Sequence, residues 1–353
     1  MSMVENLIIA AIIPLSGIES GGNILTVTGS NFPYHSINSY VSDGLVAHYD
    51  GIDNQGLGDE NHSTDTLVWK DLSGNNNNVT FSGALGNAKW TAKGFKLGDN
   101  RFFQNTALNM IGLPFGNESY TIELVWDPRQ SKNLGDGGLL GWGCNGAGSQ
   151  TNNTRFLNAT LTNQCFRHYW WSNDFDFCVP TSDNPVRNIA ITYDNTVGRR
   201  GYFNGVLFGT NSNKNKNTCT SGGFYIGKTT NNEYATGTLV FSIRIYNRQL
   251  TDAEIAQNHA IDSARFQNLP VVKIGENLCD DLKLLSDTKM TCIVPAGSGT
   301  NDITMGYGGD ENVIIGAYKY IIKNLWHSVY SIRKIFIQGK SVKNMFISGR
   351  KIF

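Results

Sequence analysis

The sequence has little charge and no long apolar run. Charged residues make up 16% of the 353 residues, and 29 basic residues balance 29 acidic ones. A zero net charge excludes the global field that attracts nucleic acid or anionic lipid. The longest apolar run near the start, Leu7–Ile13, is far shorter than the ~18–20 residues that cross a bilayer. It follows Glu5 and no basic residue, so we expect a strand there, with no membrane insertion and no secretory signal.

Several motifs that carry chemistry are missing. The six cysteines form no C-x-x-C pair, which excludes zinc-ribbon and thioredoxin-like sites. Three disulfides and six buried thiols both remain compatible with their spacing, so cysteine does not fix the compartment. Gly141–Gly146 spells G-x-G-x-x-G, but no helix pattern follows to hold a dinucleotide. The six histidines are scattered and predict neither a zinc site nor a catalytic triad.

What the chain does contain is typical of a turn-rich β protein. It has 39 glycines, and aromatic residues make up 11%. Short alternating runs recur between turn residues, which is the pattern of β-sandwiches. Asn204 and Gly205 between two apolar runs predict a tight hairpin, because both turn residues need positive φ. One helix is expected after Thr251, where Glu254 completes a capping box.

The two ends of the chain resemble the two halves of one IPT/TIG domain, a small immunoglobulin-like sandwich. The resemblance lies in three segments, Pro14–Phe32, Ile274–Cys279 and Ser286–Gly299. More than two hundred residues separate the first segment from the second. A domain inserted in a loop explains this gap, since such insertions are tolerated where the ends of the insert lie close together.

The middle of the chain resembles a LamG-like domain, which implies a concanavalin A-like jelly roll. The most specific segment is Ile243–Ile255, where a strand reading Arg-Ile-Tyr leads into the capped helix. Gly44–Asp50, Thr66–Gly74 and Tyr169–Asp174 also carry the resemblance.

We therefore predict an all-β chain. Residues 1–40 and 268–322 form the two halves of the Ig-like IPT/TIG domain, and residues 41–267 form the inserted jelly roll. The tail, 323–353, holds two ten-residue repeats, and its last 23 residues carry six basic residues and no acidic ones. These short basic repeats resemble those at the ends of phage structural proteins. Two isolated hairpin strands are marginal, so we expect the tail to pair with the sandwich or with a neighbouring subunit.

Glycan binding needs an exposed aromatic face with amide and carboxylate partners for hydroxyl groups. The candidates are Trp142, Asn145, Tyr169, Trp170, Trp171, Asn173 and Asp174. Successive strand residues point to opposite faces, so Trp170 and Trp171 cannot share one. A core position is expected for any single tryptophan of the three, and exposure for at least one of them.

The LamG-like resemblance implies a calcium site on a loop rim. Carboxylate and amide oxygens on one Gly-rich loop suit this ion. The candidate ligands are Asp50, Asp53, Asn54 and Asp59. The alternative is that these residues make local hydrogen bonds within turns.

Glycoside hydrolysis would need two carboxylates across the scissile bond. Glucanases of this fold present Glu-x-Asp-x-x-Glu on one strand, and no such string occurs here. Glu118 and Glu123 lie five residues apart and so point to opposite faces. Asp174 and Asp176 could share a face, but they fit solvated turn carboxylates. We therefore expect no catalysis.

The first hypothesis is a non-enzymatic virion protein from a tail, a fibre or a capsid decoration. Its jelly roll would bind host-surface glycan or protein, and the Ig-like domain and basic tail would bind other virion proteins, with homo-oligomerisation also open. A secreted or bacterial cell-surface adhesin is the alternative. A carbohydrate-active enzyme that uses Asp174 or Asp176 is the third.

Overall fold

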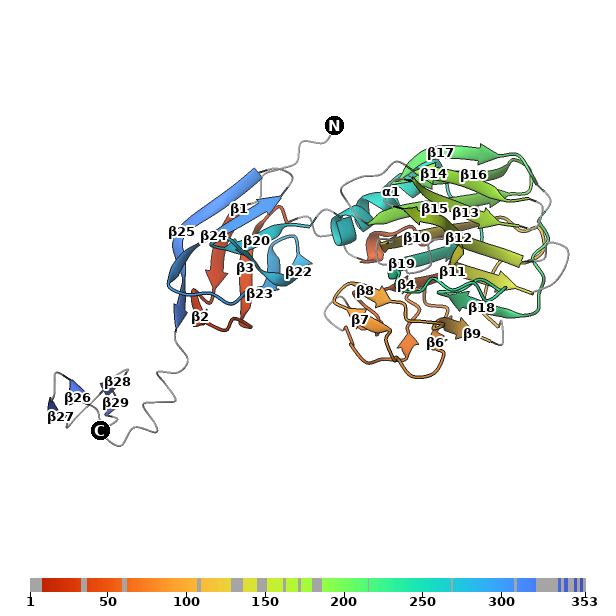
Figure 1. Cartoon of the computed structure of the whole chain (residues 1–353). Helices are drawn as coiled ribbons and strands as arrows, with labels where there is room; N and C mark the ends of the chain where they lie inside the picture. The colour runs from red at the N-terminus through yellow and green to blue at the C-terminus, as the bar shows by residue number, and fades with distance from the viewer. Residues whose placement is uncertain are drawn as a thin grey trace. The chain divides into compact units, whose positions relative to one another are not determined.

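The structure is a computed structural model, and the chain divides into two compact units. The terminal unit combines Met1–Phe32 with Pro270–Phe353, and the central unit is Pro33–Leu269 (Figure 1). The residues that the structure describes are 8–32, 37–58, 62–106, 109–127, 136–144, 151–160, 163–170, 173–179, 186–214, 216–267, 269–307, 310–321, 336–337, 340–341, 346–347 and 350–351.

The first boundary between the units lies at 32/33, upstream of the predicted 40/41. The contacts of Tyr40 explain this difference. Its hydroxyl donates to Asp262 Oδ1 at 2.8 Å, and its ring packs against the Arg244 guanidinium. Residues just before the predicted insert are therefore part of its packing. The second boundary, at 269/270, lies two residues from the predicted one.

The terminal unit joins strands from both ends of the chain in two sheets. One sheet has the order β1 (Ile8–Ile13), β3 (Ile24–Ser30), β23 (Lys289–Ile293), β22 (Asp280–Ser286). The other has the order β2 (Ser16–Ile18), β25 (Asp310–Ile321), β24 (Thr300–Tyr307), β20 (Val271–Ile274), β21 (Asn277–Leu278). Leu25 and Val27 pack with Met290 and Ile303 in one core. Neither end could bury this core alone. The identity of the unit as an IPT/TIG domain stays a prediction.

The tail contributes two short hairpins. The first pairs β26 (Phe336–Ile337) with β27 (Lys340–Ser341), and the second pairs β28 (Phe346–Ile347) with β29 (Arg350–Lys351). Each hairpin repeats the other ten residues later, in line with the repeat in the sequence.

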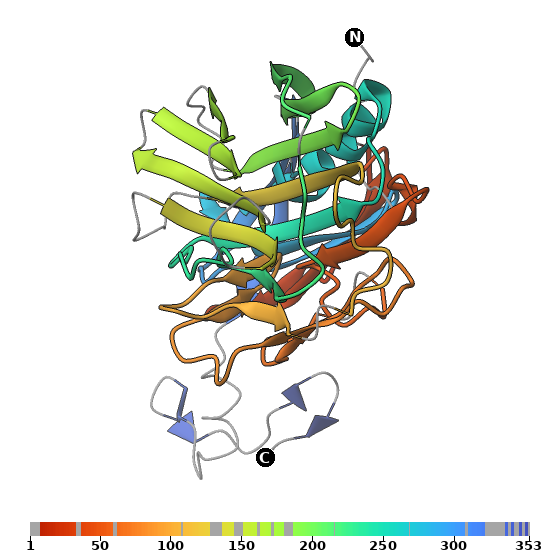
Figure 2. The ribbon, with the colours of Figure 1, turned by 90° about the vertical axis from the view of Figure 1, so that its right-hand side faces the viewer.

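The central unit is a sandwich of two eight-stranded sheets (Figures 1 and 2). The β10 sheet runs β17 (Val206–Asn211), β16 (Gly198–Phe203), β15 (Arg187–Asp194), β10 (Tyr120–Asp127), β19 (Leu239–Tyr246), β8 (Gly94–Lys96), β7 (Lys89–Thr91), with β4 (Leu45–Asp50) also paired to β19. The β11 sheet runs β14 (Phe175–Val179), β13 (Asn163–Tyr169), β12 (Thr151–Thr160), β11 (Asp136–Gly143), β18 (Gly223–Ile226), β9 (Phe103–Asn105), β6 (Val79–Phe81), β5 (Val68–Trp69).

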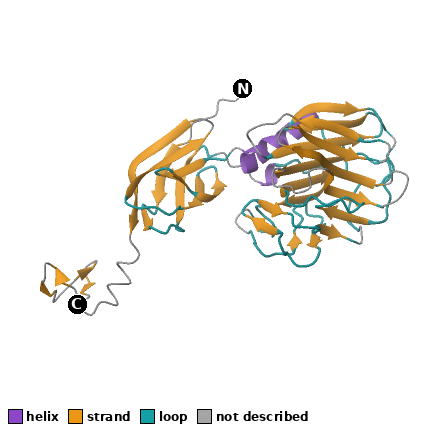
Figure 3. Cartoon of the chain, viewed as in Figure 1, coloured by secondary structure: helices purple, strands orange, loops and turns teal. Residues whose placement is uncertain are grey.

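Alternate residues of both sheets fill the core between them. Ile122 and Leu124 of β10 and Ile243 of β19 point inward from one sheet, and Trp142 and Phe224 do so from the other. All five side chains are buried. The all-β prediction with a jelly-roll domain is confirmed. Strands dominate the described part of the chain, and α1 (Asp252–Asp262) is its main helix (Figure 3). The capping box of Thr251 and Glu254 is present, as predicted.

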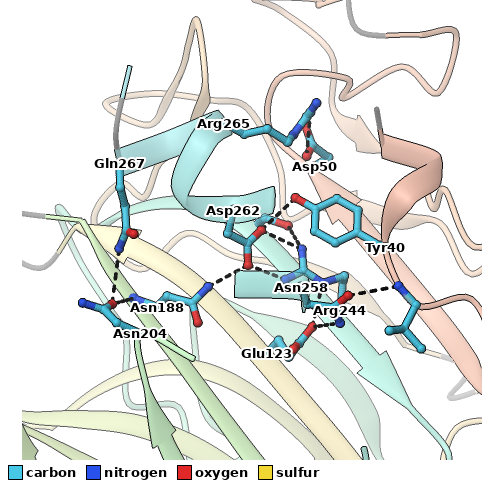
Figure 4. A network of polar contacts seen from close by, with 12 residues as sticks. Tyr40, Asp50, Glu123, Asn188, Asn204, Arg244, Asn258, Asp262, Arg265 and Gln267 are labelled. Atoms are coloured by element: carbon cyan, nitrogen blue, oxygen red, sulfur yellow. Dashed lines mark hydrogen bonds and ion pairs between the residues drawn. The ribbon is translucent and has the colours of Figure 1, made fainter. Parts of the chain in front are cut away.

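The outer face of the β10 sheet carries a buried polar network beneath α1 (Figure 4). Arg244 of β19 donates to Glu123 at 2.7 Å and to Asp262 at 2.5 Å, and all three side chains are at most 3% exposed. Asn258 of α1 donates to Glu123, and Asn188 of β15 donates to Asp262. The network therefore attaches the helix to three strands of the sheet.

Two disulfides join described cysteines of the central unit, Cys144 to Cys219 and Cys165 to Cys178. Cys279 and Cys292 of the terminal unit are not joined by one. Across the described residues, no helix is long and apolar enough to cross a membrane.

Candidate functional site

Several loops of the central unit meet at one end of the sandwich because of the strand register. Tyr120 at the start of β10 pairs with Tyr193 near the end of β15, and its neighbour Thr121 pairs with Tyr246 at the end of β19. Tyr246 in turn pairs with Leu45 at the start of β4. The segments that precede β4 and β10 and those that follow β15 and β19 therefore lie at this end.

A hollow of about 490 Å³ opens among these loops. Its lining residues are Gly112, Leu113, Phe115, Glu118, Ser119 and Asn247. Leu113 is buried and Phe115 is half-buried, whereas Glu118 and Asn247 are exposed. An apolar floor with a few polar groups around it is the usual make-up of a small-ligand site, and the volume falls in the range of such sites.

The loop that forms most of the hollow is fixed by hydrogen bonds inside it. Glu118 Oε2 accepts from the Phe115 backbone N–H at 2.8 Å, and the Glu118 N–H donates to the Phe115 carbonyl at 3.1 Å. Trp142 Nε1 donates to the Pro114 carbonyl at 3.0 Å. These bonds fix the backbone of residues 114–118 and hold the Glu118 carboxylate beside it.

The same loop is also fixed to segments far away in the sequence. Gly116 and Thr218 exchange two backbone hydrogen bonds, of 2.7 and 2.8 Å. Asn117 Oδ1 accepts from the Tyr193 hydroxyl and from the Lys216 backbone N–H. Ser119 Oγ donates to Asp194 at 2.9 Å. A site held in this way loses little conformational entropy when a ligand binds.

Charged and polar groups with shifted pKa values lie behind the hollow. Hydrogen bonds from Thr196 and Ser119 hold the pKa of Asp194 below its ordinary value. Burial raises the pKa of Tyr193 to about 12. Burial, and after it the Arg199 guanidinium, lower the pKa of Lys216 to about 7. Around neutral pH, Asp194 therefore stays ionised and Tyr193 neutral, whereas Lys216 changes its charge.

The predicted glycan residues that the structure describes, Trp142, Tyr169, Trp170, Asn173 and Asp174, are not among the residues that line the hollow. Trp142 is fully buried in the core, and Trp170 is 1% exposed. Neither ring can stack on a sugar in this structure, so for these two the core alternative holds. Asn145 and Trp171 lie outside the described residues.

The remaining predicted residues are half-buried and engaged in contacts. Asp174 forms a 3.2 Å ion pair with Arg167, which also binds Asp176 at 2.6 Å. The Asn173 carbonyl accepts from Arg199. Tyr169 is half-buried. The contacts of Asp174 and Asp176 identify them as members of a structural ion-pair cluster.

Three of the predicted calcium ligands, Asp50, Asp53 and Asn54, lie at and just after the opposite end of β4. Asp50 Oδ1 accepts from two backbone N–H groups and its Oδ2 pairs with Arg265 at 3.0 Å. Asp53 accepts from Leu57 and Gly58, and burial raises its pKa. Asn54 Oδ1 accepts from Ser63.

These oxygens accept hydrogen bonds within the loop, which is the arrangement that the turn alternative describes. Among the described residues no group of three His, Cys, Asp or Glu side chains could hold a metal. Asp59 lies outside the described residues, so calcium binding stays a prediction.

Sequence reasoning missed Phe115 and Asn247 and assigned Glu118 only a negative role. A signal for them exists. Residues 112–119 read Gly-Leu-Pro-Phe-Gly-Asn-Glu-Ser just before a buried strand, and Asn247 directly follows the Arg-Ile-Tyr of the last strand. Polar turns at the ends of two paired strands lie side by side, but the pairing of β10 with β19 has to be known first.

Comparisons with known proteins agree with the fold. Residues 103–256 match the concanavalin A-like lectin/glucanases superfamily. A comparison with curated protein sequences gives no match.

Three solved structures are similar to parts of the chain. Trypanosoma rangeli sialidase is 20% identical over 62% of this chain, with a TM-score of 0.40. Domain 4 of AbnA, a GH43 extracellular arabinanase from Geobacillus stearothermophilus, in complex with arabinotriose, is 19% identical over 61%, with a TM-score of 0.44. The Ruminococcus gnavus IT-sialidase CBM40 is 14% identical over 46%, with a TM-score of 0.35.

These similarities differ in how much of the other protein they cover. The aligned region spans 32% of the sialidase, 98% of the arabinanase domain and 95% of the CBM40. The chain thus spans about a third of the sialidase. The two sheets and their common core form a concanavalin A-like jelly roll, and the sequence match to the superfamily lies within it, at residues 103–256.

Proposed function

We propose that the central unit is a non-enzymatic carbohydrate-binding module and that the hollow beside Phe115 is its sugar site. The observation that carries this proposal is the combination of an apolar floor with exposed polar side chains on a loop that is already fixed. Sugars present apolar C–H faces and hydroxyl groups at once. Phe115 and Leu113 suit the first, and Glu118 and Asn247 suit the second.

Glu118 keeps capacity for a sugar hydroxyl. Its hydrogen bond from the Phe115 backbone uses one carboxylate oxygen, whereas an ionised carboxylate offers about four lone-pair sites. The Asn247 side chain can both donate and accept. These two groups would fix the orientation of a sugar ring that rests on Phe115.

The lining favours binding over hydrolysis. Glycosidases of the usual kind need two carboxyl groups across the scissile bond. Of the six residues that line the hollow, Glu118 alone carries a carboxylate. Glu123, the next acidic residue along the chain, is buried against Arg244 on the other side of the sheet.

A glycan array tests the proposal. The wild-type protein should bind a defined set of glycans, and Phe115→Ala should weaken that binding about tenfold through the lost ring contact. Phe208→Ala is the matched control, since Phe208 is an exposed phenylalanine on the edge strand β17. Absence of glycan binding by the wild type, or equal binding by both variants, would contradict the proposal.

For the whole protein we propose a virion role, in which the terminal unit and the tail bind other virion proteins and the module binds the host surface. Its support is the basic ten-residue repeat of the tail. Detection of the chain in purified particles by mass spectrometry tests this role.

A secreted or cell-surface adhesin is the second candidate. The two disulfides of the central unit favour it, because disulfides persist in oxidising surroundings. Recovery of the chain from the culture medium or cell surface without particles would support the adhesin and contradict the virion role.

A further inference from the structure

A buried arginine in the central unit has no carboxylate partner. Arg199 of β16 is 1% exposed. Its Nη1 lies 3.1 Å from the His168 carbonyl and 3.2 Å from His168 Nδ1, and its Nη2 donates to the Asn173 carbonyl. Among the described residues no carboxylate forms an ion pair with it, and its Nε has no hydrogen-bond acceptor. The positive charge stays in this buried position, because an arginine side chain is not deprotonated in proteins.

The acceptors that Arg199 does have are neutral. Two of them are backbone carbonyls. The third is His168, and because burial lowers its pKa well below the ordinary value, its ring carries no charge at neutral pH. Asp174 and Asp176 act on Arg199 from beyond ion-pair distance and form their own ion pairs with Arg167. A buried charge without a counterion is costly. The position therefore favours a negative group that the described residues do not supply.

A second buried cation is connected to the first. Lys216 is 1% exposed, and its Nζ donates to Asn213 Oδ1. The Asn213 amide donates in turn to Asn173 Oδ1, and the carbonyl of the same Asn173 accepts from Arg199. The Arg199 guanidinium contributes to the lowered pKa of Lys216, which is the effect of one cation on another nearby. An anion close to both side chains would relieve this repulsion.

An indole N–H adds a second unused donor. Trp170 is 1% exposed, and its Nε1 has no acceptor. The Lys216 ammonium lies 5.6 Å from the centre of the Trp170 ring, and the Trp170 carbonyl accepts from the Asn173 N–H at 2.7 Å. Buried polar groups are nearly always hydrogen-bonded, so two unused N–H groups in one cluster indicate a further acceptor. The residues of this cluster, here called the Arg199 cluster, are His168, Trp170, Asn173, Arg199, Asn213 and Lys216.

We propose that the Arg199 cluster binds a small monovalent anion, which is chloride under ordinary conditions. A water molecule could accept from the unused N–H groups, but it would leave the guanidinium charge without a counterion. Chloride supplies both the acceptor and the charge, and it is small enough to lie among side chains that are almost entirely buried. The anion site does not rest on the proposed sugar site, because none of the six residues lines the hollow.

The anion would also stabilise the loop of the hollow. The Lys216 backbone N–H donates to Asn117 Oδ1 at 3.1 Å. Tyr193, which pairs with Arg199 across β15 and β16, donates its hydroxyl to the same oxygen. Asn117 belongs to the loop that lies between Gly116 and Glu118. An anion that holds Lys216 and Arg199 in place therefore helps to hold this loop.

Thermal melting of the whole chain in sodium chloride and in sodium methanesulfonate, at equal ionic strength, tests the proposal. Methanesulfonate is too bulky for a buried site and controls for screening. At pH 6.5, where Lys216 with its pKa of about 7 is mostly charged, chloride should raise the wild-type melting temperature by about 3 °C over methanesulfonate. Arg199→Met and Lys216→Met should abolish this difference. Arg200→Met is the matched control, because Arg200 is the next residue on β16 and forms a partly exposed ion pair with Asp252.

Line broadening in chlorine-35 NMR gives a measurement that does not depend on stability. The wild type and Arg200→Met should broaden the chloride line, and Lys216→Met should remove most of this broadening. If Arg199→Met unfolds the protein, Lys216→Met and the line widths decide. Equal line widths for the wild type and a folded Lys216→Met variant would overturn the anion site and assign the unused donors to water. A chloride-dependent melting shift that persists unchanged in Lys216→Met would overturn it as well.

Discussion

The two sheets of the central unit differ in what lies on their outer faces. On the β10 sheet, outward residues such as Thr121, Glu123 and Arg244 are at most 2% exposed, under α1 and the segments around it. On the β11 sheet, the outward Tyr225 and Tyr169 are half-buried. The first face has its own small cores and a charge network, whereas the second presents aromatic side chains.

This contrast teaches that polarity does not by itself mark a functional face. The charged cluster of Glu123, Arg244 and Asp262 is buried and serves to attach the helix. The β11 face has a charged cluster of its own, Arg167 with Asp174 and Asp176, which is partly exposed. Tests of the contrast follow, from the largest expected effect to the smallest.

Arg244→Met should destabilise the central unit most. It leaves Glu123 and Asp262 buried without their cation, which costs about 3–5 kcal/mol in free energy of unfolding. Urea denaturation followed by tryptophan fluorescence measures the loss. Arg200→Met is the control, because the ion pair of Arg200 with Asp252 is partly exposed and contributes at most about 1 kcal/mol. Equal losses would show that the network does not attach the helix.

Acid should destabilise the central unit through His48 and His168. Burial lowers the pKa of both well below 6.5, so below pH 6.5 the unfolded chain binds protons that the folded chain does not. As the pH is lowered in this range, the free energy of unfolding decreases by up to about 1.4 kcal/mol per pH unit for each histidine. Denaturation curves between pH 7.5 and the acid range measure the slope, and His168→Gln should reduce it. An unchanged slope in that variant would assign the effect to other groups.

Removal of the Cys144–Cys219 disulfide should weaken ligand binding at the hollow by a few fold. Cys219 directly follows Thr218, which holds the hollow's loop through Gly116. We expect Cys219→Ser to bind the array glycans less tightly, as a less ordered site must lose more entropy. Cys178→Ser removes the disulfide between β13 and β14 and serves as the control. Equal binding by both variants would show that the loop at Gly116 is fixed without the Cys144–Cys219 disulfide.

Removal of metal ions by chelation should have the smallest effect on stability. The oxygens of Asp50, Asp53 and Asn54 are engaged in turn hydrogen bonds and an ion pair, so we expect EDTA to leave the melting temperature unchanged. Differential scanning calorimetry with EDTA and with added calcium measures it. A rise in melting temperature with calcium would support the calcium site predicted from the sequence.

Local patterns in the sequence predicted the fold well. Asn204 and Gly205 both have positive φ in the turn between β16 and β17, and the capping box of Thr251 starts the helix. Such features depend on a few neighbouring residues. Whether a given tryptophan is buried depends instead on segments that are far away in the sequence. Trp142 and Trp170 are buried because the opposite sheet and the loop at Pro114 pack against them, and strand alternation alone leaves both faces open.

The candidate site was harder to predict because it depends on pairing between distant segments. Phe115 and Asn247 lie more than one hundred residues apart in the sequence and meet through the pairing of β10 with β19.

The path of the chain at the ends of the central unit has a further consequence. The Val41 backbone N–H donates to Asn258, and Gln257 donates to the Ser39 carbonyl, so the incoming and outgoing segments are fastened to each other within the central unit itself. A host protein therefore has to supply only two adjacent attachment points. The module could be transplanted into an unrelated scaffold, or replaced by another of different specificity, without redesign of either partner.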